Sequence, residues 1–188
     1  MDLVDIFDLV KGKLLAVRFS DQYCDEFTYA FKKWEDTEYL FNYFNEHEQQ
    51  ICNGFYQEES IEVAAFKTID EAEIFRQKIL KCAKKGNFDD NNSLQDVIFK
   101  PLSKNTHRAL EKSKSYGTND NSWLRVYAIR IEADCYVVTG SGIKLTATMQ
   151  EDPLLVIELK KLELAQKYLK ELGIEVPEDF GTIDIKKT

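Results

Sequence analysis

The sequence predicts an α+β domain in which helices pack on one face of a small antiparallel sheet. Three patterns carry this prediction: a compact apolar run at 13–20, helical stretches with apolar residues at 3/4 spacing, and two strand-like runs around a short turn at 124–143. A chain of 188 residues with 44% apolar content is long enough for one globular core. We therefore assign residues 1–173 to a single domain and residues 174–188 to a polar C-terminal tail.

The first third of the chain predicts one strand followed by helices. The run KLLAVRFS places Leu15, Val17 and Phe19 on one face of a buried strand. Aromatic-rich helical sequence follows, and Asp36 or Thr37 is suited to cap a second helix, so this region is either a helical hairpin or one long kinked helix. Its apolar positions at 3/4 spacing are Phe27, Ala30, Phe31, Trp34, Leu40, Phe41 and Phe44.

A further helix is predicted over 68–86. Thr68 and Glu71 have the spacing of a capping box, lysines occupy the last turn, and Gly86 is the expected C-cap residue. The preceding residues 52–66 combine an Asn-Gly turn signal with mixed periodicity, which predicts a loop with at most a short element.

The middle of the chain is polar before it becomes strand-like. Residues 87–93 predict a linker, and 94–102 an edge strand, because Pro101 cannot donate a hydrogen bond to a neighbouring strand. Residues 103–122 predict a polar loop that is basic in its first half. The runs LRVYAIRI and CYVVTGSG then flank Glu-Ala-Asp, which predicts an antiparallel hairpin.

The last predicted element is a long amphipathic helix over 152–173. Asp152 is its N-cap, Pro153 suits the first helical position, and Gly173 ends the helix. If its leucine stripe faces another chain rather than its own core, the protein is a homodimer through this helix. The stripe consists of Leu155, Leu159, Leu162, Leu169 and Leu172.

Composition argues against several classes of protein. The N-terminus carries three aspartates where a signal peptide has basic residues, and no apolar run reaches the roughly 20 residues of a membrane span. A soluble, cytoplasmic protein without a membrane partner is therefore expected. The four cysteines are far apart in sequence and there are two histidines, so we expect neither a metal site nor a cofactor.

The net charge of −8 conceals a basic block. Residues 76–150 hold 13 basic and 7 acidic side chains, whereas residues 1–75 hold 6 basic and 17 acidic ones. Such asymmetry is typical of a protein in which one face meets an anion, although it also arises by chance. Within the block, Lys100 ends one predicted strand, Arg125 begins the next, and Lys144 follows the last.

Whether these cations meet depends on the register of the hairpin. A three-residue loop at Glu-Ala-Asp pairs Arg125 with Ser141 and sends Lys144 to the opposite face of the sheet. A two-residue turn, or a bulge at Gly-Ser-Gly, brings Arg125 and Lys144 to the same face. The sequence permits both arrangements.

The segments FKPL, LRVYAIRI and YVVTGSGIK resemble the RelE/ParE superfamily of toxins from toxin–antitoxin modules. The resemblance covers residues 13–20 and 94–146, under half of the chain. In that family a strand, a helical hairpin and three further strands form the core, and ribosome-dependent mRNA cleavage by the RelE branch depends on basic residues at matching strand positions. This chain departs from the pattern in its length, its acidity, its additional helices, and the lack of a tyrosine after Lys144.

The resemblance implies a toxin-like protein, either an mRNA endoribonuclease or an RNA-binding relative. Its implied partners are RNA or the ribosome and an antitoxin-like protein. Arg125, Lys144 and Lys100 match the family's basic positions, which implies a phosphate clamp and two charge stabilisers. His107, the single histidine of the basic block, is the candidate general base. The further candidate RNA contacts are Lys104, Arg108, Tyr127 and Arg130.

A different hypothesis stays open beside this one. The chain is then a non-catalytic intracellular protein–protein interaction domain whose sheet edge or C-terminal helix docks a partner. In that case Arg125, Arg130 and Lys144 are solvated strand ends, His107 is a surface loop residue, and Tyr127 is a core aromatic.

Overall fold

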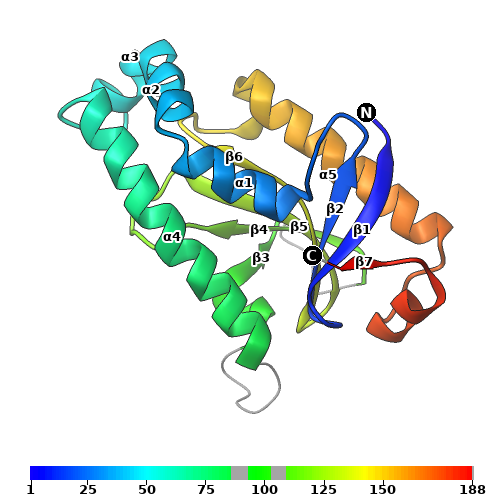
Figure 1. Ribbon diagram of the computed structural model, residues 1–188. Coiled ribbons are helices and arrows are strands. Elements are labelled where there is room, and N and C mark those ends of the chain that lie inside the picture. Colours follow the sequence, from blue (N-terminus) through cyan, green and yellow to red (C-terminus); the bar gives the residue numbers. More distant parts are fainter. Residues whose placement is uncertain (86–92, 103–108, 188) are drawn as a thin grey trace.

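The computed structural model describes residues 1–85, 93–102 and 109–187. Within these residues seven strands form one sheet in the order β3-β4-β5-β6-β2-β1-β7 (Figure 1). The strands are β1 (Leu3–Val10), β2 (Leu14–Phe19), β3 (Phe99–Pro101), β4 (Glu111–Tyr116), β5 (Leu124–Glu132), β6 (Cys135–Ile143) and β7 (Lys186–Lys187). Neighbouring strands are antiparallel except for β2 with β6 and β1 with β7.

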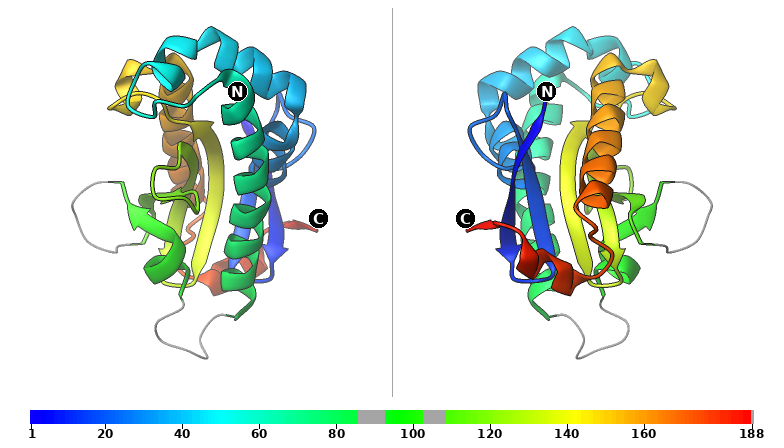
Figure 2. Two further views of the ribbon diagram at one scale, coloured as in Figure 1. Left: turned by 90° about the vertical axis from the view of Figure 1, so that its left-hand side faces the viewer. Right: turned by 90° about the vertical axis from the view of Figure 1, so that its right-hand side faces the viewer.

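The helices cover both faces of this sheet. They are α1 (Glu26–Glu35), α2 (Thr37–Glu46), α3 (Glu48–Cys52), α4 (Ile61–Lys85) and α5 (Pro153–Glu171), with short turns η1 (Leu94–Ile98), η2 (Met149–Glu151) and η3 (Pro177–Thr182). Figure 2 shows α4 and α5 on opposite sides of the central strands. The predicted α+β class is confirmed, but its helices do not share one face, because α5 lies opposite α1 and α4. No helix in the described ranges is long and apolar enough to cross a membrane.

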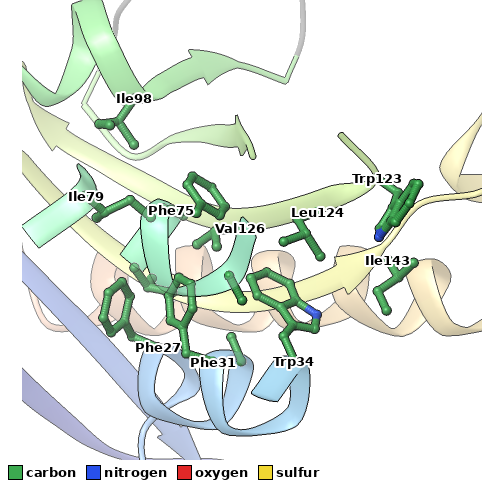
Figure 3. Close-up of a cluster of buried hydrophobic side chains, with 14 of the residues drawn as sticks. Phe27, Phe31, Trp34, Phe75, Ile79, Ile98, Trp123, Leu124, Val126 and Ile143 are labelled. Atoms are coloured by element: carbon green, nitrogen blue, oxygen red, sulfur yellow. The ribbon is translucent and has the colours of Figure 1, made fainter. Parts of the chain in front are cut away.

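Two hydrophobic cores result from this arrangement. Along β2, Leu14 and Ala16 point into the first core, whereas Leu15 and Val17 point into the second. The first core lies under α1, α2 and α4 and is rich in aromatic rings from α1 and α4, together with Trp123 (Figure 3). The second lies under α5, where Leu155, Leu162, Ala165 and Leu169 are buried.

This burial corrects the homodimer hypothesis based on the leucine stripe. Leu155, Leu162 and Leu169 are at most 1% exposed, because they pack against the chain's own sheet. Leu159 also packs against this core, and only Leu172 is substantially exposed. The stripe therefore offers no surface to a second chain.

The predicted aromatic-rich helical region forms two helices, α1 and α2, which are separated only by Asp36 and follow each other at an angle (Figure 1). Asp36 accepts a hydrogen bond from the Tyr39 N–H at 2.9 Å and is the N-cap of α2, one of the two residues predicted for this role. The predicted caps of the last helix are also confirmed, since Asp152 accepts from the N–H groups of Leu154 and Leu155. These local hydrogen bonds are readable from sequence because they span only two or three residues.

Helix α4 begins earlier than predicted. It starts at Ile61, so the residues before Thr68 that were predicted as a loop include its first two turns. Thr68 and Glu71 are therefore interior residues of α4 rather than a capping box, and both are buried. The predicted C-cap Gly86 and almost all of the linker at 87–93 lie outside the described residues.

Four further segments differ from the sequence-based prediction. Residues Leu3–Val10, for which no element was predicted, form strand β1, and the expected loop at 103–122 contains strand β4. The predicted edge strand at 94–102 is a π-helical turn followed by the short β3, which does form one end of the sheet. The tail that begins at residue 174 contributes to the second core, because Ile174 and Phe180 are buried there.

Candidate nucleic-acid interface

The register of the β5–β6 hairpin brings Arg125 and Lys144 to the same face. Glu132 pairs with Cys135 across a two-residue turn, and two compensating register shifts follow, the second one beside Gly140. As a result Arg125 pairs with Gly142, and Lys144 lies two residues beyond that partner. Of the two alternatives left open by the sequence, the structure has the one that brings these cations together.

Further basic residues lie on the same side of the sheet. Tyr116 of β4 pairs with Arg125, and Lys114, two residues before it, pairs with Tyr127. Tyr127 belongs to the core under α5, so all of these side chains are on the α5 side. Lys112 pairs with Ile129 on the same side, but its Nζ lies 3.4 Å from Glu163 Oε1 of α5. We call the other charged and aromatic residues that gather on this side, at one end of β3, β4, β5 and β6, the basic face: Lys100, Lys114, Tyr116, Arg125 and Lys144.

Arg125 is the central residue of the basic face. Its Nη1 donates to the backbone oxygens of Ser122 at 2.7 Å and Leu124 at 2.8 Å, and its guanidinium carbon lies 4.2 Å from the centre of the Tyr116 ring. Burial lowers the pKa of Arg125, but a guanidinium stays charged at neutral pH. Nε and Nη2 form no hydrogen bond with a described residue, and Arg125 as a whole is 9% exposed.

Lys144 is held in place by hydrogen bonds of its backbone and of its side-chain ammonium group. Tyr56 donates its hydroxyl to the Lys144 backbone oxygen at 2.8 Å, and Tyr43 does the same to Ile143 at 3.0 Å. The Lys144 Nζ donates to the backbone oxygens of Thr146 and Ala147. Burial lowers the pKa of Lys144, and the neighbouring charges of Arg125 and Lys114 lower it further. The three cations are therefore close enough to affect one another.

Helix α4 supports this end of the sheet from the opposite side. The Trp123 Nε1 donates to the Thr68 Oγ1 at 2.9 Å, and Glu71 Oε1 accepts from the Asn119 N–H at 2.9 Å. Trp123 precedes β5, and its backbone oxygen accepts from the Lys144 N–H at 2.8 Å. Thr68 and Glu71 thus position the segment that carries the basic face, a role that their capping-box spacing did not indicate.

The remaining predicted site residues are not all part of the basic face. Lys100 is: it pairs with Lys114, although its Nζ is exposed and donates to the Asp96 backbone oxygen at 2.6 Å. Arg130 lies on the opposite face, where its Nε donates to Gln95 Oε1 at 2.9 Å. Tyr127 is fully buried under α5 and has no surface on which a base can stack. The positions of Lys104, His107 and Arg108 lie outside the described residues.

Sequence reasoning missed two members of the face, Lys114 and Tyr116. They lie in the segment Lys-Ser-Lys-Ser-Tyr, which alternates long and short polar side chains but contains no aliphatic residue. The small side chains Ser113 and Ser115 are buried toward α4, and the long ones point to the basic face. The alternation itself was the available signal for a strand.

Among the described residues no three or more His, Cys, Asp or Glu side chains are grouped to hold a metal ion. The basic face instead offers charged N–H donors and an aromatic ring that is 46% exposed at Tyr116. Comparison of the chain with family models, curated proteins and solved structures gave no match. The chemistry of the face is therefore the basis for assigning a function.

Proposed function

We propose that this protein binds RNA through the basic face, as a toxin-like endoribonuclease or an RNA-binding relative of the RelE/ParE type. The observation that carries the proposal is the convergence of Arg125 and Lys114 at the Tyr116 ring, with Lys144 on the same face and close enough for the two cations to lower its pKa. Cations clustered on one face of an acidic protein create a local site for phosphates while the remaining surface repels them.

Each side chain of the face has a chemical role in this proposal. Arg125 presents its remaining N–H donors to a phosphate, and Lys114 and Lys144 add point charges beside it. One face of the Tyr116 ring is covered by Arg125, with Lys114 5.4 Å from the ring centre. The exposed part of that ring is a platform on which an unpaired base stacks.

Cleavage would proceed by attack of a 2′-hydroxyl on the adjacent phosphodiester. The new 2′-oxygen–phosphorus bond forms as the bond to the 5′-oxygen breaks, which leaves a 2′,3′-cyclic phosphate and a 5′-hydroxyl. One group removes the 2′ proton, another protonates the 5′-oxygen, and Arg125 stabilises the additional negative charge. Lys144 suits proton transfer because burial and two neighbouring cations lower its pKa.

The order of elements is consistent with the RelE/ParE resemblance. Strand β2 is followed by helices α1 and α2, and the three segments of the resemblance, FKPL, LRVYAIRI and YVVTGSGIK, fall on β3, β5 and β6. Among the described residues the additional elements include strands β1, β4 and β7 and helices α3, α4 and α5, and β4 separates β3 from β5 in the sheet. The proposal rests on the basic face, and this order of elements supports it.

The binding test uses a fluorescently labelled single-stranded RNA and fluorescence anisotropy at several salt concentrations. We expect Lys114→Ala with Lys144→Ala to weaken binding and to reduce the slope of log affinity against log salt by about 1–2. The matched control removes Lys78 and Lys81, which are exposed on α4 at the other side of the sheet. Equal losses in the two double variants would exclude the basic face as the binding site.

The activity test compares bacterial growth on induced expression of the wild type, the Lys114→Ala, Lys144→Ala variant and the Lys78→Ala, Lys81→Ala control. Growth arrest that only the first variant relieves, with RNA fragments ending in 2′,3′-cyclic phosphate, identifies an endoribonuclease. RNA binding without such fragments identifies an RNA-binding relative. Absence of both binding and growth arrest would refute the proposal.

A further inference from the structure

A second surface lies on α4, on the opposite side of the sheet from the basic face. Val63, Phe66 and Ile74 are 40%, 57% and 59% exposed, and their positions fall on one side of the helix. They line a groove of about 600 Å³ between α4 and Asn119. Exposed apolar side chains gathered along one groove are typical of an interaction surface.

The walls of this α4 groove are held rigidly. The Phe66 ring packs edge-on against Phe41 of α2, with ring centres 6.3 Å apart. On the other side, the Asn119 N–H is bound by the buried Glu71. These contacts order two sides of the groove before a ligand binds, which reduces the entropy cost of binding.

Most charged residues that line the groove are acidic, and the two exposed acidic ones have no ion-pair partner among the described residues. Glu62 and Asp70 line it, both are exposed, and neither forms an ion pair with a described residue. The one lysine of the groove, Lys67, is paired with Glu58, with Nζ and Oε1 2.5 Å apart. A partner must therefore supply positive charge as well as apolar side chains.

We propose that the α4 groove binds a basic amphipathic helix of a partner protein. Apolar side chains spaced three or four residues apart on that helix contact Val63, Phe66 and Ile74, and its Lys or Arg side chains pair with Glu62 and Asp70. The α4 residues that line the groove run from Glu62 to Ile74, which is about 18 Å along a helix and matches about three turns of a partner helix. This binding is independent of the RNA-binding proposal, because it uses neither the same residues nor the same face.

The test is selection from a phage-displayed library of random helical peptides, followed by affinity measurement on synthetic peptides. Selection against wild-type protein, with removal of phage that bind Phe66→Ser, Ile74→Ser, is expected to enrich peptides of positive net charge. Their affinity should fall about tenfold or more in that variant. Asp70→Lys should weaken it further, through charge rather than lost apolar contact.

The control variant Ile157→Ser, Leu164→Ser removes two exposed apolar side chains from α5 and should bind as the wild type does. All substituted groove and control residues are exposed, and circular dichroism checks that each variant is folded. The proposal is overturned if no enriched peptide depends on Phe66 and Ile74, or if the dependent peptides are acidic or neutral. It is also overturned if the wild type self-associates and Phe66→Ser, Ile74→Ser abolishes this, since the occupant is then a second copy.

Discussion

Lys161 of α5 and Glu26 of α1 form an ion pair, with Nζ 2.7 Å from Oε1, although their helices pack on opposite faces of the sheet. The same Nζ lies 2.9 Å from Glu158 Oε1, and Glu158 Oε2 accepts from the Ser141 N–H at 2.9 Å. Strand β6 pairs with β2 only over Tyr136–Val138, and Ser141 is beyond that segment. The network therefore joins α1, β6 and α5 where the two halves of the sheet are no longer hydrogen-bonded to each other.

Removal of Lys161 should destabilise the protein strongly. In Lys161→Ala the buried carboxylates of Glu26 and Glu158 lose their common partner, and breaking a buried ion pair in this way costs about 3–5 kcal/mol. The matched control is Lys167→Ala, because the exposed pair of Lys167 with Glu171 is worth only about 0.3–0.5 kcal/mol. Urea denaturation measures both, and similar losses would show that burial of the network has little effect.

Stability should decrease between weakly acidic and neutral pH because of Glu26. Burial and the nearby Glu158 raise its pKa from 4.5 to about 7, against the opposing effect of Lys161. In this pH range the folded protein binds more protons than the unfolded chain, so the free energy of unfolding falls as pH rises through it. Relative to Glu26→Gln, the wild type should lose on the order of 3 kcal/mol between pH 4.5 and pH 8. Denaturation curves at several pH values test this, and parallel pH profiles for the two proteins would contradict it.

Gly140→Ala should destabilise the junction between β6 and α5. An alanine Cβ would lie 1.8 Å from Glu158 Oε2, and that carboxylate is held by Lys161 and the Ser141 N–H. Crowding of this kind typically costs about 1–3 kcal/mol. Gly181→Ala is the control, since its Cβ meets no atom within 4 Å and should change stability by less than about 0.5 kcal/mol. Equal stability of the two variants in guanidinium denaturation would refute the prediction.

Thr68→Val tests the link between α4 and the segment before β5. Valine has nearly the shape of threonine but leaves the buried Trp123 Nε1 without an acceptor, which costs about 1–3 kcal/mol. The control is Thr182→Val, where the lost hydrogen bond to Asp179 is exposed to water. We expect the first variant alone to lower the midpoint of urea unfolding, and an unchanged midpoint would mean that this hydrogen bond contributes little.

The elements that sequence reasoning identified have local signals. The continuous apolar run of β2, the aromatic spacing of α1 and the caps of α5 each involve neighbours along the chain. The sequence of β2 also indicates burial on both faces, because nearly all of its residues are apolar rather than every second one. That pattern predicts helices on both sides of the sheet, and α1 and α5 do lie on its opposite faces.

The two strands that sequence reasoning missed, β1 and β4, contain polar residues and pair with the strand that follows each of them in sequence. Strand β1 carries Asp5, which is acceptable there because Arg18 of β2 binds it. Strand β4 has almost no apolar residue of its own, and its buried Ser113 and Ser115 are covered by groups from other segments. Strand β4 is therefore stabilised by pairing rather than by its own hydrophobicity, whereas the mostly apolar sequence of β1 did hold a signal for a strand.

The sequence by itself determined the α+β class, the β5–β6 hairpin, the cap of α5 and the concentration of basic residues in the middle of the chain. Only the tertiary structure decided that Arg125 and Lys144 share a face with Lys114 and Tyr116, and that Arg130 does not. The physical reason is that side chains alternate between the two faces of a strand, so a register change of one residue moves a side chain to the other face. That register follows from a two-residue turn, two compensating shifts, and the packing of both faces against helices from distant parts of the chain.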